Sequence, residues 1–106
     1  MADLLYNAVL EKYAEGDFDE VFEFDGIIPE STTVTDKTVT VTRDDGVDVT
    51  DSLVSAVSHS GTTVTVSIHP GTTETAYAIK VVVTASDLSQ SVMLKLLNVV
   101  SAGVYR

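Results

Sequence analysis

The segment TAYAIKVVVT, residues 75–84, carries the clearest structural signal in the chain. Every second position from Tyr77 to Val83 holds a large apolar residue, and residues such as Ala78 and Lys80 lie between them. An alternation with a period of two predicts a β-strand that buries one face against a core and exposes the other.

Shorter alternations on both sides of this segment predict further strands. FDEVFEF at 18–24, TVTVT at 38–42 and TVTVSI at 63–68 alternate in the same way, and residues 53–58 give a weaker signal. The apolar run 92–100 predicts a last strand whose pattern switches face near Leu96, as at a bulge. Turn signals at Asp44-Asp45-Gly46, Ser60-Gly61 and Pro70-Gly71 separate the strands. This spacing predicts a mainly β protein, an antiparallel β-sandwich of about seven strands.

The alternation also predicts which residues fill the core. They are Phe22, Phe24, Val39, Val41, Val64, Val66, Ile68, Tyr77, Ile79, Val81 and Val83. Tyr77, at the start of the penultimate strand, is expected to bury its ring.

Residues 3–15 show a helical spacing instead. Asp3 is a plausible N-cap and Gly16 a plausible stop. The apolar stripe comprises Leu4, Leu5, Ala8 and Val9. The sequence therefore predicts a short N-terminal α-helix over 1–16, a β-domain over 17–100 and a flexible tail over 101–106. A helix this short needs a surface to cover, which is either its own domain or another subunit.

Charge and composition limit the functions that the chain can have. The 106 residues include no Cys and carry a net charge of −10, of which residues 1–30 contribute −8. Nucleic acid and anionic membranes are disfavoured as partners because an acidic chain repels phosphate. No apolar run approaches the ~20 residues of a membrane span, and the acidic, amphipathic N-terminus does not resemble a signal peptide.

Few residues suggest chemistry. His59 and His69 flank the strand 62–68 at opposite ends, so neither a catalytic constellation nor a shared metal site is expected. The acidic residues around the turn at 44–51 form a solvated turn or, less plausibly, a calcium site, because their spacing is not that of an EF-hand. No nucleotide-binding or hydrolase motif occurs. We expect no catalytic residue, no metal and no cofactor.

The order of motifs along residues 17–99 resembles a known family. The resemblance is carried by the segment FDEVFEFDGIIPESTTVT and, later in the chain, by a Gly-containing turn followed by TAYAIKVVVTASD. The matching positions are Phe22, Phe24, Asp25, Ile28, Thr33, Gly71, Tyr77, Ile79, Val81, Thr84 and Asp87. These features resemble small immunoglobulin-like virion proteins of tailed bacteriophages, of the tail-fibre or head-tail adaptor type. The family usually has Gly in the turn before the last strand, where this chain has Leu88.

The resemblance implies an immunoglobulin-like fold and a non-enzymatic structural protein, an adaptor or assembly subunit of the virion that acts through protein–protein contacts. Its partners would be other virion proteins, and it would be a homo-oligomer or occur in several copies, without binding nucleic acid or membrane. It would be made in the host cytoplasm and lie in the virion. The expected partner-binding residues are Leu4, Leu5, Ala8 and Val9 of the helix, with Asp19, Glu23 and Asp25 of the first strand. The density of these acids suggests a basic partner surface or, alternatively, only the protection of an edge strand from unwanted pairing. The alternatives are a carbohydrate- or surface-binding module on the same fold and, more weakly, a small hydrolase.

Overall fold

The computed structural model describes residues 4–13, 17–69 and 75–100, and the side chains of 17–69 and 76–99. The elements are β1 (Leu4–Tyr13), β2 (Phe18–Glu23), β3 (Val34–Arg43), α1 (Thr50–Leu53), β4 (Val54–Ser60), β5 (Thr63–Ile68), β6 (Thr75–Ala85) and β7 (Gln90–Val100). Within the described ranges the chain is mainly β, as the sequence predicted, with one short helix, α1, that the sequence did not predict.

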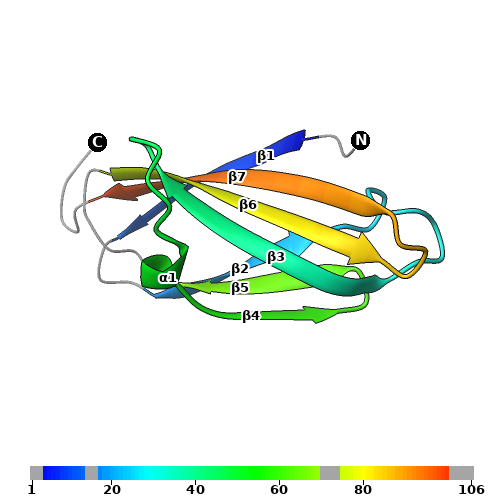
Figure 1. Cartoon of the computed structure of the whole chain (residues 1–106). Helices are drawn as coiled ribbons and strands as arrows, with labels where there is room; N and C mark the ends of the chain where they lie inside the picture. The colour runs from blue at the N-terminus through cyan, green and yellow to red at the C-terminus, as the bar shows by residue number, and fades with distance from the viewer. Residues whose placement is uncertain (1–3, 14–16, 70–74, 101–106) are drawn as a thin grey trace.

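The strands form two layers (Figure 1). Over the described part of the chain, one sheet has the strand order β1-β7-β6-β3 and the other the order β2-β5-β4. Neighbouring strands pair antiparallel, except that β1 runs parallel to β7. Each sheet therefore combines strands from distant parts of the sequence.

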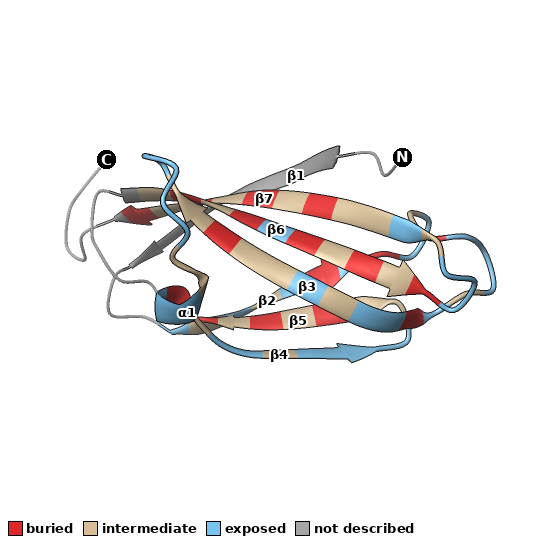
Figure 2. Cartoon of the chain, viewed as in Figure 1, coloured by how far each residue is buried: buried red, intermediate tan, exposed pale blue. Residues whose placement is uncertain are grey.

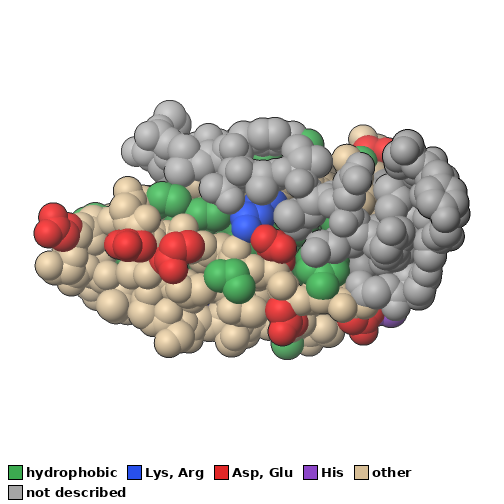
Figure 3. All heavy atoms as spheres, turned by 180° about the vertical axis from the view of Figure 1, so that it is seen from behind, with side chains coloured by type: hydrophobic (Ala, Val, Ile, Leu, Met, Phe, Trp, Pro, Cys, Tyr) green, Lys and Arg blue, Asp and Glu red, His purple; other side chains and the backbone are tan. Residues whose placement is uncertain are grey.

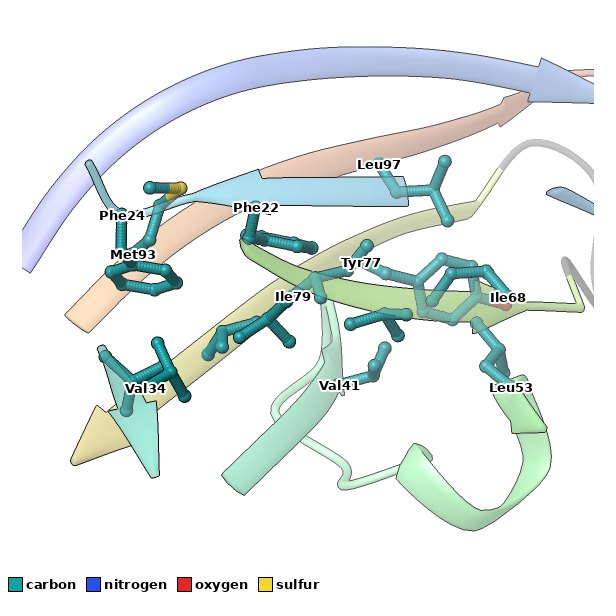
Figure 4. Packing of buried hydrophobic residues seen from close by; sticks show 14 of the residues in the cluster. Phe22, Phe24, Val34, Val41, Leu53, Ile68, Tyr77, Ile79, Met93 and Leu97 are labelled. Atoms are coloured by element: carbon teal, nitrogen blue, oxygen red, sulfur yellow. The ribbon is translucent and has the colours of Figure 1, made fainter. Parts of the chain in front are cut away.

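One hydrophobic core lies between the layers. Inward-facing residues alternate with exposed or half-buried ones along β5, β6 and β7, which appears as banding in Figure 2. Figure 4 shows Phe22 and Ile68 of one sheet packed near Tyr77, Ile79 and Leu97 of the other. Because both sheets contribute to the same cluster, burial of this cluster holds the layers together.

The predicted core is confirmed except at one position. Val39 is only half-buried, whereas Val41 on the same strand is fully buried. The core also contains residues that the sequence analysis did not assign to it: Ile28, Val34, Leu53, Ala85, Met93, Leu97 and Val99.

The predicted N-terminal helix is wrong, because Leu4–Tyr13 forms β1. Leu4 lies opposite Val92 and Val9 opposite Leu96 in the register with β7. A helix of thirteen residues is marginal by itself, whereas the edge of β7 offers backbone partners along its length. Because the segment is an extended strand, the helical spacing of its apolar residues does not apply. Asp3, Gly16 and the tail 101–106 lie outside the described residues.

The weak strand predicted over 53–58 is confirmed as β4, which runs from Val54 to Ser60 after the helical turn α1. The predicted bulge near Leu96 is wrong, because β6 and β7 pair in one continuous register from Thr75 to Thr84. β7 is apolar on both faces, so its composition alone could not reveal which residues point inward. The continuous register places Lys95 on the inward face.

Candidate functional site

The two histidines lie toward opposite ends of β5. His59, in β4, is opposite Val64, whereas His69 directly follows Ile68. This placement agrees with the separation predicted from the sequence. It does not bring the two imidazoles together as ligands of one ion.

His69 has a carboxylate partner that the sequence analysis missed. Its Nδ1 lies 2.5 Å from Oδ1 of Asp17, and both side chains are mostly exposed. A hydrolytic triad would also need a hydroxyl bonded to the other ring nitrogen. The two serine hydroxyls beside the pair have other partners: Ser67 donates to Asp19, and Ser55 donates to the Ser67 carbonyl. Neither serine is thus bonded to His69. The contact between Asp17 and His69 joins the start of β2 to the end of β5.

The outward-facing acids of β2 bond to the neighbouring strand. Asp19 accepts a hydrogen bond from a β5 hydroxyl, and Glu23 accepts hydrogen bonds from the hydroxyls of Thr62 and Thr63. The Thr62 hydroxyl is the main reason that the pKa of Glu23 lies below its usual value. Two of the predicted partner-binding acids are thus engaged within their own sheet. Asp25, the third, is exposed in the loop after β2.

The contact between Glu23 and Thr62 predicts a change in acid sensitivity. Because the pKa of Glu23 is lowered on folding, its hydrogen bonds stabilise the fold above the ordinary value of 4.5, and this stabilisation is lost as the pH falls through the lower folded value. Thr62→Val should raise the pKa of Glu23 toward 4.5. Wild type should melt at a higher temperature than the variant at about pH 7. This difference in melting temperature should decrease as the pH is lowered toward about pH 2.

An NMR titration of the Glu23 side chain measures this shift directly. Thr65→Val, in strand β5 just after Thr62 and opposite Val21, is the matched control and should leave the titration unchanged. A Glu23 titration that is identical in wild type and Thr62→Val would contradict the prediction.

The acidic turn after β3 consists of separate carboxylates with local partners. Asp45 accepts two hydrogen bonds from the Arg43 guanidinium, which lower its pKa. Asp48 accepts hydrogen bonds from the backbone N–H and the hydroxyl of Thr50, which lower its pKa likewise. Among the described residues no group of three or more metal-ligating side chains occurs. The geometry favours the solvated turn over the calcium site.

Lys95 is the buried charged residue of the core region, and the sequence analysis did not single it out. Its Nζ lies 2.6 Å from Oε2 of Glu20 and 2.7 Å from the carbonyl oxygen of Val21. The ammonium also lies 4.5 Å from the centre of the Phe22 ring. The side chains of Lys95 and Glu20 are 8% and 16% exposed. The pair links β7, an interior strand of one sheet, to β2 at the edge of the other.

Figure 3 shows the side of the molecule opposite to that of Figure 1. Several acidic side chains lie across it, and a basic side chain lies among them.

The outward face of β6 and β7 is largely apolar. We call it the β6–β7 face; it comprises Ala76, Ala78, Lys80, Val82, Val92, Leu94 and Leu96. All of these residues except the exposed Lys80 are half-buried. At one end lies a shallow hollow of about 380 Å³ lined by Thr42, Ala76, Ala78 and Leu96, among others.

A sequence signal for this face exists. Val81, Val82 and Val83 form an unbroken apolar run, and Leu94 and Leu96 alternate with inward-facing residues. Strands that are apolar on both faces are typical of sheets covered on both sides. Among the described residues, no element of the chain covers this second face (Figure 1).

Leu88 is a separate exposed apolar residue in the turn between β6 and β7. It is 82% exposed and adopts a φ of 71°, in the left-handed region that favours glycine. Ser31, in the loop between β2 and β3, also has a positive φ, of 67°. The two loops lie side by side, because Ser86 donates a backbone hydrogen bond to the Thr33 carbonyl.

No helix in the described part of the chain is long and apolar enough to cross a membrane. Comparison of the chain with models of protein families gives no match, and comparison with curated protein sequences gives no significant match.

Proposed function

We propose that the chain is a non-enzymatic assembly subunit of a tailed-phage virion that binds other virion proteins through the β6–β7 face. Its fold is an immunoglobulin-like β-sandwich. The subunit acts by contact alone, and several copies on one particle turn weak contacts into firm attachment through avidity.

The strand order supports the immunoglobulin-like assignment. In such domains strands B, E and D form part of one sheet, while strands C, F and G form the other. The orders β2-β5-β4 and β3-β6-β7 correspond to these two groups. The buried Tyr77 at the start of β6 occupies the position of the tyrosine that begins strand F in many of these domains.

The observation that carries the functional proposal is the β6–β7 face. A chain with a net charge of −10 has no shortage of polar residues to place on a solvated sheet face, as the threonines of β3 show. Val82, Leu94 and Leu96 instead form a contiguous apolar patch with one positive charge, Lys80, among them. Such patches mark protein–protein contact sites, and the lysine suits a partner with a carboxylate at the matching place.

The carbohydrate-binding alternative gains no support from the described aromatic residues. Glycan sites require exposed rings, yet Phe22, Phe24 and Tyr77 are buried and Phe18 is half-buried. The expected partner role of residues in β1 remains a prediction, now placed on a strand instead of a helix.

Incorporation into particles tests the proposal. Virions of the phage that encodes the chain are purified and the subunit is quantified against a major virion protein by mass spectrometry. Wild type should be present in several copies. Leu94→Glu/Leu96→Glu should reduce incorporation at least about tenfold, because two carboxylates would have to be desolvated in the contact.

Ser52→Glu/Ser60→Glu, at two exposed positions in α1 and at the end of β4, adds the same charge away from the β6–β7 face and is the matched control. It should be incorporated normally. Absence of the wild-type chain from virions contradicts the virion role. Normal incorporation of the leucine variant, with thermal unfolding verified, contradicts the assignment of the face.

A further inference from the structure

Free sheet edges present unpaired backbone N–H and C=O groups, which attract other strands unless a protein protects them. In the two sheets, β2, β3 and β4 are edge strands with described side chains. Comparing how these three edges are protected shows which of them is open to a partner.

The edge at β2 is doubly protected. Asp19 and Glu23 place negative charge along this edge. The ammonium of Lys95 also donates a hydrogen bond to the carbonyl oxygen of Val21, which is then not available to another strand. A second strand pairing here would meet repulsion from the carboxylates and compete with a buried ion pair.

The edge at β3 is covered by the chain itself. The N–H of Val41 donates to the Thr50 hydroxyl, and its carbonyl accepts a hydrogen bond from the N–H of Val49. The N–H of Arg43 donates to the carbonyl of Val47. Near its start, β3 carries Asp36 beside a register shift, and both features discourage pairing.

In the described part of the chain, the edge at β4 has no charged side chain and no covering segment; it does have a register shift with β5 between Val54 and Ala56, at the start of the strand. The strand VSAVSHS contains no Asp, Glu, Lys, Arg or Pro over its seven residues. It lies at the margin of the lower layer and is mostly exposed along its length (Figure 2). Among the described residues, no backbone hydrogen bond joins it to any strand other than β5.

We propose that β4 is a self-association site, at which two copies of the chain pair their β4 strands antiparallel about a twofold axis. The two three-stranded sheets then form one continuous sheet across the dimer. The proposal concerns a different surface from the β6–β7 face and does not depend on the proposed function.

Charge explains why the occupant is a second copy and why β4 is the strand used. Pairing through β4 puts the two acidic β2 strands at opposite ends of the joined sheet, five strand spacings or about 24 Å apart. This distance exceeds the Debye length of about 8 Å at physiological ionic strength, so their repulsion is screened. Pairing through β2 would bring like charges within about 5 Å. In a twofold-symmetric contact each strand meets an identical copy of itself. A strand without charged residues therefore meets no like charge there.

The symmetric register can be stated. Placing the twofold axis at Val57, the centre of β4, sets Val57 opposite its own copy and Ala56 opposite Ser58 of the second copy. Ala56 and Ser58 are both exposed in the single chain. They are therefore positions at which charge can be introduced without disturbing the core.

Sedimentation over loading concentrations from about 10 µM to about 1 mM tests the proposal. Wild type should shift with concentration from 11.3 kDa toward twice that mass, as expected of a small interface. Ala56→Glu/Ser58→Glu places carboxylates opposite carboxylates and should weaken the dimer about tenfold or more. Ala56→Lys/Ser58→Glu places opposite charges across the axis and should restore or exceed the wild-type affinity in this register.

Leu94→Glu/Leu96→Glu is the matched control, since it changes the charge as much as the double glutamate variant but leaves β4 intact. It should dimerise like wild type. A monomer throughout the concentration range overturns the proposal. A dimer whose affinity is unchanged in both β4 variants also overturns the proposal. If that dimer is lost in Leu94→Glu/Leu96→Glu, the two copies associate through the β6–β7 face. Failure of the lysine–glutamate variant to recover the dimer overturns the stated pairing.

Discussion

Lys95→Met is expected to lower the free energy of unfolding by about 3 kcal/mol. The substitution keeps most of the apolar stem but leaves the Glu20 carboxylate without its partner in a site where its side chain is only 16% exposed. Removing one member of a buried ion pair costs about 3 to 5 kcal/mol because the remaining charge is desolvated and unpaired. The lower end applies here, since some water reaches Glu20. The melting temperature should fall by about 15 °C.

Urea unfolding of the two single variants and the double variant measures the coupling between the partners. Glu20→Leu/Lys95→Met should be within about 1 kcal/mol of wild type, because replacing both charges with apolar groups removes the desolvation cost along with the attraction. If Lys95→Met is as stable as wild type, the ion pair does not contribute as the geometry indicates. If the double variant is as unstable as the single one, packing of the stems and not charge is responsible.

Phe22→Ala is expected to lower the free energy of unfolding by about 4 kcal/mol. Phe22 is fully buried between the sheets (Figure 4), and truncation of its ring leaves a cavity that the strands cannot close. The ring also lies beneath the Lys95 ammonium, so the variant loses a cation–π contact in a partly desolvated place. For a domain whose total stability is about 5 to 15 kcal/mol, this loss is severe.

The neighbouring residue supplies the control for this prediction. Val21 is 48% exposed on the outward face of the same strand, and Val21→Ala should cost less than about 1 kcal/mol. Equilibrium unfolding in urea measures both variants under the same conditions. Similar losses at the two positions would contradict the alternation of buried and exposed faces along β2.

The sequence predicted the inward-facing residues well where one face of a strand is polar. Val64, Val66 and Ile68 alternate with Thr and Ser, so the buried side is unambiguous, and all three are buried. The same reasoning failed for β7. Leu94 and Leu96 are as apolar as Met93 and Leu97, and only the pairing with β6 decides which pair is inside.

The N-terminal segment shows a second limit of sequence reasoning. The spacing of Leu4, Leu5, Ala8 and Val9 fits a helix, but a short helix gains little on its own. Pairing with β7 competes for the same backbone groups and prevails. That alternative partner is about ninety residues away in the sequence, and no local pattern points to it.

Local alternation, turn residues and charge were enough to establish a mainly β protein, the part of its core that lies on strands with one polar face, and the acidic character of the chain, because each of these depends on residues close together in the chain. The pairing of Lys95 with Glu20, the covering of the β3 edge and the exposure of β4 and the β6–β7 face were decided only by the tertiary structure. They depend on which distant strands become neighbours, and that choice reflects the burial and hydrogen bonding of the whole chain.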